Sequence, residues 1–174
     1  MNYRIEQDFL GELKIPHDAY YGVHTARALA NFNLPNYHLT HNYLIQGFAK
    51  VKIAAANANY RTGKINSETC KAIIFACEQI LAGKYLDQFT IPAIQGGAGT
   101  STNMNANEVI ANIALEHLGY EKGRYDILHP INHVNMSQST NDAYPTAIKL
   151  GIYELINEVE RNLKYLRRCL EDKA

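Results

Sequence analysis

The chain has no net charge, no dense basic cluster and no long apolar run, and each absence excludes a class of protein. Among its 174 residues, 17 Lys and Arg balance 17 Asp and Glu. A nucleic-acid surface needs a basic excess and an anionic membrane surface needs clustered Lys and Arg, so we expect neither partner. The longest uncharged stretch, residues 88–107, is rich in Gly, Ser, Thr and Asn, which does not suit a membrane span.

Cysteine is scarce, and its spacing matches no metal or redox motif. Cys70, Cys77 and Cys169 form no CxxC pair, and no HExxH or Cys/His ligand spacing occurs. The N-terminus has Arg4 and acidic residues where a secretory signal has its apolar core. Since an odd number of isolated thiols suits a reducing compartment, we expect a cytoplasmic protein without a structural metal site.

Hydrophobic periodicity predicts four helices after an irregular N-terminal segment. Residues 3–5 or 20–21 could be brief strands there, between Gly and Pro punctuation. The helices are expected from about residue 39 to before Gly63, from Asn66 to Gly83, from Thr100 to about Leu118, and from about Asp142 to the end of the chain. Cys70 and Cys77 fall on the apolar stripe of the second helix, so packing is their expected role.

The last predicted helix is too long for its own domain. About thirty residues reach roughly 45 Å, whereas a compact domain of this size has a radius of gyration of about 16 Å. Its apolar residues step by four and three, close to a coiled-coil seam that needs another helix, and Pro145 is expected in its first turn. No Gly cap or Pro follows before Ala174, which predicts a chain cut within a helix; a fraying terminal helix is the alternative.

Two loops share a composition that is typical of an anion site. Residues 95–108 (QGGAGTSTNMNANE) and 135–146 (NMSQSTNDAYPT) are dense in hydroxyl and amide side chains, and each runs into a helix N-terminus. Unpaired N–H groups and the helix dipole bind anions there, and Ser and Thr add neutral donors. The helix after the first loop also carries four Asn, a poor helix former. One loop for each end of a dicarboxylate is the simplest interpretation, and ordinary helix capping is the alternative.

Other catalytic and nucleotide motifs are missing. The stretch GAGTST lacks the third glycine of GxGxxG, and no Lys precedes Ser or Thr as in a P-loop. No nucleophile–base pair and no acidic couple is visible. The seven His residues are dispersed, and apart from His129 they are expected to lie on the surface or to form hydrogen bonds. The residues therefore favour a small carboxylate over a nucleotide as ligand.

The two loops resemble the first two signature regions of the aspartase/fumarase superfamily. GGAGTSTNMNANEVIAN (residues 96–112) and HVNMSQSTNDAYPTA (residues 133–147) are similar to those of the aspartate ammonia-lyases, as is the opening RIEQDFLGELKIPHDAYYGVHTARALANF (residues 4–32). Class II fumarases usually have a GSGT-type first loop and a QSSND-type second loop. GAGTST and QSTND therefore favour an aspartase, and the resemblance covers nearly the whole chain.

The resemblance implies reversible elimination of ammonia from L-aspartate to give fumarate, without a cofactor. A base removes a proton from Cβ, and preorganised neutral donors stabilise the charge that spreads into the β-carboxylate. The matching positions are Thr100, Ser139 and Thr140 for this carboxylate and Asn141 for the substrate amino group. Both loops would then converge on one carboxylate and the amine. Some members are activated by divalent cations, which leaves such activation open for the full-length enzyme.

One motif departs from the family pattern, and others are absent. The second region usually begins HPND and lines a secondary anion site, whereas this chain has His129 and Pro130 followed by Ile131 and Asn132. We therefore do not carry this site over, although His129 matches. In the family, the Thr-His pair that holds substrate follows these regions and would lie beyond Ala174. The GSSxMPxKxNP loop, which supplies the catalytic Ser and a carboxylate-binding Lys, is also absent.

The resemblance also implies a mainly α chain of two parts. Residues 1–141 would form the N-terminal lyase domain with minor short β strands, and residues 142–174 would start the central helical bundle. That bundle holds a homotetramer in which three subunits build each active site. We expect an N-terminal portion of an aspartate ammonia-lyase, inactive alone because it lacks the base. A class II fumarase and a non-catalytic helical module that binds carboxylates or a partner helix are the alternatives.

Overall fold

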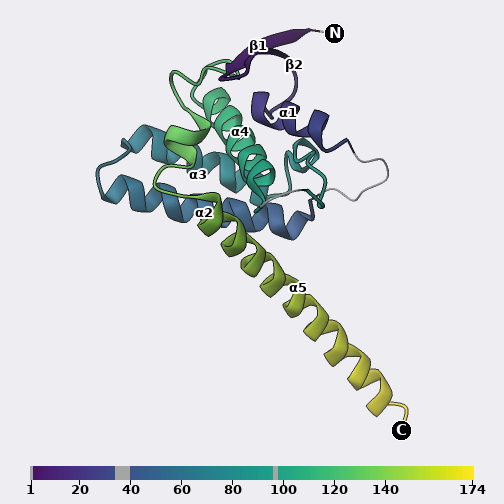
Figure 1. Ribbon diagram of the computed structural model, residues 1–174. Helices are drawn as coiled ribbons and strands as arrows, with labels where there is room; N and C mark the ends of the chain where they lie inside the picture. The colour runs from purple at the N-terminus through teal and green to yellow at the C-terminus, as the bar shows by residue number, and fades with distance from the viewer. Residues whose placement is uncertain (1, 34–39, 96–97) are drawn as a thin grey trace.

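The computed structural model describes residues 2–33, 40–95 and 98–174, and most of them are helical (Figure 1). Two strands come first, followed by five α-helices and two short helical turns: β1 (Tyr3–Asp8), β2 (Gly11–Pro16), α1 (Val23–Asn31), α2 (Asn42–Arg61), α3 (Ser67–Leu81), η1 (Leu86–Gln88), α4 (Thr100–His117), η2 (Pro130–Val134) and α5 (Thr140–Glu171). The predicted fold class, mainly α with minor strands, is confirmed. None of the described helices is long and apolar enough to cross a membrane.

The strands β1 and β2 form an antiparallel hairpin. The register joins Tyr3 to Pro16 and Asp8 to Gly11. Gly11, at the turn, has a φ of +110°, a conformation that costs a glycine far less than other residues. The strand expected near residues 3–5 is therefore confirmed and extends three residues further.

Helix α1 was not predicted from the periodicity. The described residues show no strand at residues 20–21, where one was expected, and α1 begins shortly afterwards. Its N-cap residue, Gly22, has no side chain to accept a hydrogen bond. The backbone N–H of Gly22 donates to Glu108 Oε2 at 2.8 Å, and that of Val23 donates to Glu6 Oε2 at 2.9 Å. Because distant carboxylates replace a local cap, the sequence carries no start signal here.

Local signals set the ends of the next three helices. Asn66 caps α3 by accepting a backbone N–H. Gly63, Gly83 and Gly119 follow α2, α3 and α4 with φ of 73°, 85° and 84°, the left-handed conformation that ends many helices. These predicted ends are confirmed. The expected helix start near residue 39 lies outside the described residues. As described, α2 begins at Asn42, two residues after Thr40.

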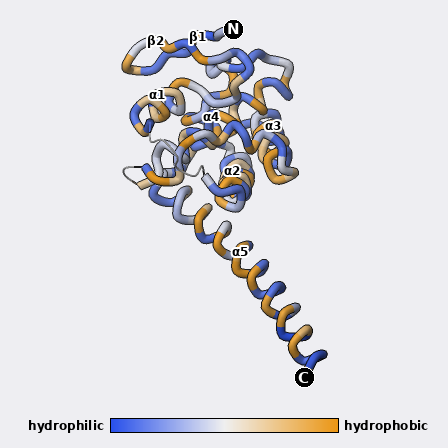
Figure 2. Tube along the Cα trace, turned by 90° about the vertical axis from the view of Figure 1, so that its right-hand side faces the viewer, coloured by the Kyte–Doolittle hydropathy of each residue, from blue (hydrophilic) through white to orange (hydrophobic). Residues whose placement is uncertain are grey.

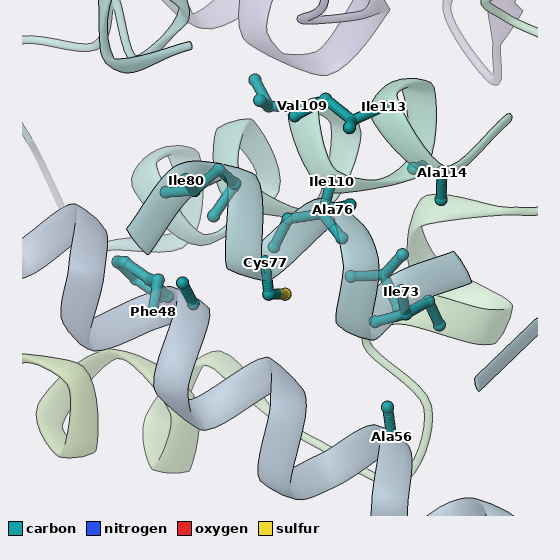
Figure 3. Packing of buried hydrophobic residues seen from close by; sticks show 14 of the residues in the cluster. Phe48, Ala56, Ile73, Ala76, Cys77, Ile80, Val109, Ile110, Ile113 and Ala114 are labelled. Carbon is teal, nitrogen blue, oxygen red and sulfur yellow. The ribbon is translucent and has the colours of Figure 1, made fainter. Parts of the chain in front are cut away.

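Helices α2, α3 and α4 enclose one apolar core. Figure 3 shows side chains of all three pointing into the same interior, among them Phe48 of α2, Ile73 and Ile80 of α3 and Ile110 of α4. All four are fully buried. Cys77 lies in their midst, and Cys70 is buried on the same helix as free thiol. The predicted packing role of these two cysteines is confirmed.

Helix α5 crosses α2 closely and then leaves the rest of the chain (Figures 1 and 2). A Cβ at Gly47 would overlap the carbonyl oxygen of Ala147, and one at Gly151 would lie 2.9 Å from the Tyr43 carbonyl oxygen. Glycines at the crossing thus allow the backbones to touch. Beyond it, apolar side chains recur along α5 (Figure 2) and are about half exposed or more: Ile156, Val159, Leu163, Leu166 and Leu170. The predicted overhanging helix with an exposed apolar seam is confirmed.

The start of α5 corrects the sequence prediction. The helix begins at Thr140 with Ser139 as N-cap, two residues before the expected start at Asp142. Asp142 instead completes a capping box with Ser139, its Oδ1 accepting from Ser139 N at 3.1 Å. Pro145 therefore lies inside the helix and not in its first turn as predicted. The expected domain boundary between residues 141 and 142 falls within this first turn and stays a prediction.

Candidate functional site

The first turns of α4 and α5 lie against each other. Gly99, the N-cap residue of α4, has a φ of +82°, and a Cβ there would lie 2.5 Å from ring carbons of Tyr144 in α5. Only glycine meets both the backbone conformation and this contact without strain. Of the predicted glycine-rich loop, Gly96 and Gly97 lie outside the described residues. The part that is described brings the two predicted loops together at their helix starts.

Asn103, in the first turn of α4, joins the two loops directly. Its Nδ2 donates to Thr140 Oγ1 at 3.1 Å and to Asn135 Oδ1 at 3.2 Å. Asn103 is buried, and Thr140 is half-buried. The Asn103 amide thus links α4 both to the first residue of α5 and to the loop that precedes α5.

A buried cation supports the same loop from behind. Lys52 of α2 is fully buried, and its Nζ donates to Asn135 Oδ1 at 2.7 Å and to Gln138 Oε1 at 3.0 Å. Burial lowers the pKa of Lys52 to about 7, and the weaker opposing effects of Cys77 and Asp142 do not offset it. Lys52 was not predicted as part of the site. The available signal was its position four residues after Phe48, on the apolar stripe of the helix.

The predicted site residues stand at these two helix starts. Thr100 is exposed at the first position of α4, and no described side chain caps this helix. Ser139 and Asn141 are exposed, and Ser139 Oγ accepts from Asn141 N at 3.2 Å. Helix capping, the alternative interpretation, is therefore one role of Ser139. Since the Ser139 oxygen acts there as acceptor, its own hydrogen stays available to a ligand. The substrate contacts of these four residues remain predictions.

The four Asn of α4 divide into two groups. Asn105 Nδ2 donates to Gln88 O at 3.1 Å, and Asn107 Nδ2 donates to the Met104 sulfur at 3.6 Å. Asn112 donates to Tyr20 O at 2.8 Å and accepts from a backbone N–H. Asn105 and Asn112 hold neighbouring segments to the helix, whereas Asn107 bonds within it. Among the hydrogen bonds of the described residues, Asn103 is the member of the four that bonds to the second loop, so the functional interpretation of the four Asn narrows to it.

His129 lies apart from these helix starts, at the cap of η2. Its Nδ1 accepts from the backbone N–H of Ile131 at 3.0 Å and of Asn132 at 3.3 Å. A cavity of about 560 Å³ lies beside it, lined by Gln7, Asp8, Phe9, His24, His129, Ile131 and Asn132. Burial lowers the pKa of His129, and His133 and His24 lower it further. With Nδ1 accepting, Nε2 is the ring nitrogen left to donate, and the lowered pKa disfavours the cationic form that would bind an anion most strongly.

The titratable side chains do not gather into a metal centre in the described part of the chain. Within residues 2–33, 40–95 and 98–174, no group of three or more His, Cys, Asp or Glu is placed to hold a metal ion. The acidic side chain nearest to the α5 start, Asp142, is engaged in the capping box. The chemistry available at the two helix starts is therefore that of neutral donors and helix dipoles.

The chain is similar to known lyases along nearly its whole length. It is 51% identical over 172 residues to an aspartate ammonia-lyase of Helicobacter pylori (strain J99), a match that covers 98% of this chain and 37% of that protein. The structure of a fumarate lyase:delta crystallin from Brucella melitensis bound to cobalt superposes with a TM-score of 0.91 at 51% identity, covering 94% of this chain and 36% of that one. A class II fumarase from Schistosoma mansoni gives a TM-score of 0.82 at 38% identity, covering 87% and 32%.

Two facts from these comparisons bear on the identity of the chain. It spans little more than a third of the length of the curated relatives it matches. A family model described as lyase matches residues 11–174. The chain therefore belongs to the lyase family, within the aspartase/fumarase superfamily that its two loops predict.

Proposed function

We propose that this chain is the N-terminal part of an aspartate ammonia-lyase, which reversibly eliminates ammonia from L-aspartate to give fumarate. The observation that carries the proposal is the junction of two helix N-termini through Asn103, with the hydroxyls of Thr100, Ser139 and Thr140 at the first positions of both helices. The names of the relatives, and the third of their length that the chain spans, support it.

The chemistry asks for stabilisation of a carboxylate whose charge doubles. When a base removes a proton from Cβ, the electron pair spreads into the β-carboxylate. Hydroxyl donors at Thr100, Ser139 and Thr140, with the positive ends of two helix dipoles, would favour this form over the ground state. The amide of Asn141 would orient the amino group. No charged side chain stands at these positions, so stabilisation would come from fixed dipoles.

The remaining parts of the reaction belong to the rest of the proposed enzyme. The GSSxMPxKxNP loop, with its base and its lysine, is absent from this sequence. We place residues 1–141 in a lyase domain and residues 142–174 in a helical bundle of a homotetramer, where the exposed seam of α5 would be covered. A cytoplasmic location belongs to the same proposal.

Class II fumarase is the second candidate, because a fumarase structure superposes closely on this chain. The wording of both loops, GAGTST and QSTND, favours the aspartase. A non-catalytic module that binds carboxylates is the third candidate, and it needs a reading frame that stops at Ala174.

Sequencing the gene beyond the codon for Ala174, followed by an assay of the encoded protein, tests the proposal. We expect the frame to continue into a Thr-His pair and a GSSxMPxKxNP loop. The purified full-length protein should release ammonia from L-aspartate and form L-aspartate from fumarate and ammonium, whereas the 174-residue chain alone should do neither. A stop codon at this point, turnover by the 174-residue chain, or hydration of fumarate without use of ammonium would overturn the proposal.

A further inference from the structure

We propose that Asn103 is a positioning residue that fixes the direction of the Thr140 hydroxyl, so that its hydrogen points to the substrate carboxylate. The inference rests on the proposed function. Asn103 itself need not touch the substrate. It determines whether the Thr140 hydroxyl, which would touch the substrate, is free to donate its hydrogen there.

In the contact between Asn103 and Thr140, the amide donates and the hydroxyl accepts. Asn103 Nδ2 is a donor only, and it lies 3.1 Å from Thr140 Oγ1. Thr140 Oγ1 must therefore accept in this contact, and its own hydrogen must go elsewhere. No described residue accepts that hydrogen. A hydroxyl that receives a hydrogen bond is also a better donor, because the two bonds polarise each other.

The orientation of the Asn103 amide is fixed by a second partner. Turning the amide over would put its oxygen against Asn135 Oδ1, which now accepts from Asn103 Nδ2 at 3.2 Å. Asn135 Oδ1 also accepts from the buried Lys52 at 2.7 Å, so it stays an acceptor. The lysine thus fixes Asn135, Asn135 fixes Asn103, and Asn103 fixes Thr140.

The arrangement leaves Asn103 Oδ1 unsatisfied. This oxygen is buried and has no hydrogen-bond partner in the described part of the chain. An unpaired buried acceptor costs about 1–3 kcal/mol. Asn105 and Asn107 on the same helix have the same unpaired oxygen, so the partners of the Asn103 nitrogen are what distinguish this side chain. We therefore assign the role of Asn103 to the two hydrogen bonds that its Nδ2 donates.

Isosteric substitutions in the full-length enzyme test the inference. Asn103→Leu keeps the shape and removes the donor, and Thr140→Val keeps the shape and removes the hydroxyl. We expect each to lower kcat/KM for L-aspartate about 10- to 100-fold. The double variant should lie within about twofold of Thr140→Val, because Asn103 acts through Thr140. Succinate is a dicarboxylate that cannot react. Its Kd should rise in these variants, and it should rank them in the same order as the loss of kcat/KM does.

Asn105→Leu is the matched control. Asn105 lies on the same helix, is as deeply buried and likewise has an unsatisfied Oδ1. Its Nδ2 donates to the backbone carbonyl of Gln88, which lies outside the second loop. Its variant should keep wild-type kinetics and resemble Asn103→Leu in its urea unfolding midpoint. If Asn103→Leu does not fold, Asn103→Ala takes its place in the cycle with the same expected pattern.

The outcomes separate the two proposals. An active wild type with unchanged kinetics in Asn103→Leu, or with losses that add fully to those of Thr140→Val, overturns the positioning role alone. Equal kinetic losses in the Asn103 and Asn105 variants also overturn it, because they would reflect a structural effect. A full-length wild type without activity on L-aspartate overturns the proposed function, and this inference falls with it.

Discussion

Two helix N-termini in this chain differ in which group faces their unpaired backbone N–H groups. At α1, the carboxylate of Glu108 accepts from the backbone N–H groups of Gly22, His24 and Thr25 and from the Thr25 hydroxyl, at 2.6–3.1 Å. At α4, Thr100 stands at the first position, and no described side chain caps the helix. The first N-terminus is closed by the protein's own carboxylate. At the second, which we call the open terminus, no described side chain takes that place, and we propose that the substrate carboxylate binds there.

The closed terminus shows which groups this fold uses to hold a carboxylate. Backbone N–H groups of a first helical turn and one threonine hydroxyl surround Glu108, and no Lys or Arg takes part in its hydrogen bonds. The proposed substrate site uses the same kinds of group at α4 and α5. What differs is burial. Glu108 is fully buried, whereas Thr100 and Ser139 are exposed and can be reached by a ligand.

Among the substitutions that test this comparison, those at the proposed substrate site should have the largest effect, and this effect is on the rate of catalysis. In the full-length enzyme, Thr100→Ala or Ser139→Ala should lower the rate of aspartate elimination about 10²- to 10³-fold, as the loss of an oxyanion donor does. Ser67→Ala is the control, because Ser67 is likewise the first residue of a helix, α3, and belongs to neither loop. Steady-state kinetics with L-aspartate measure the effect. Wild-type rates in both variants would remove these loops from the mechanism.

The closed terminus should respond in stability and not in chemistry. Glu108→Gln leaves one acceptor oxygen where two now serve four donors, so an amide N–H group would face a backbone N–H. We expect the free energy of unfolding to fall by about 1–3 kcal/mol. Urea denaturation of the 174-residue chain measures this, with the exposed Glu121→Gln as control. Equal midpoints for the two variants would show that α1 does not depend on Glu108 for its N-terminus.

The same contrast explains what could be predicted from the sequence. The ends of α2, α3 and α4 follow from Asn66 and from glycines at positive φ, which are local signals. The start of α1 could not be predicted, because its carboxylates come from positions 17 and 84 residues away in the chain. The capping box of Ser139 and Asp142 is also local, yet the predicted start of α5 lies two residues too late.

The candidate site was predictable in its residues but not in its support. Hydroxyl-rich loops at two helix starts are visible in sequence, and so is the resemblance that gives Thr100 and Ser139 their proposed roles. The link through Asn103 is not visible, because it joins residues 37 apart in the chain. Lys52 was also missed, since its amide partner Asn135 lies 83 residues away. Periodicity assigns a face to a residue, but it does not say which polar groups meet there.

The smallest effect concerns Lys52, the buried charge behind the open terminus. Its pKa in the folded chain is about 7, below its ordinary 10.5, so between these values the unfolded chain binds more protons than the folded one. The cost of burying the charge is therefore complete below pH 7 and is relieved as the pH rises. We expect the free energy of unfolding to increase with pH in this window, by at most about 1.4 kcal/mol per pH unit.

Lys52→Met should abolish this rise, whereas Lys149→Met, which removes an exposed lysine, should keep it. Urea denaturation between about pH 7 and pH 8.5 is the measurement. The upper limit matters because burial raises the pKa of Cys77 to about 12, from an ordinary value of 9.0. The unfolded chain loses that proton first, so Cys77 lowers stability at higher pH and would mask the effect of Lys52. Parallel pH curves for wild type and Lys52→Met would mean that Lys52 has an ordinary pKa. In that case Lys52 would stay charged throughout this pH range while its Nζ holds the loop before Thr140.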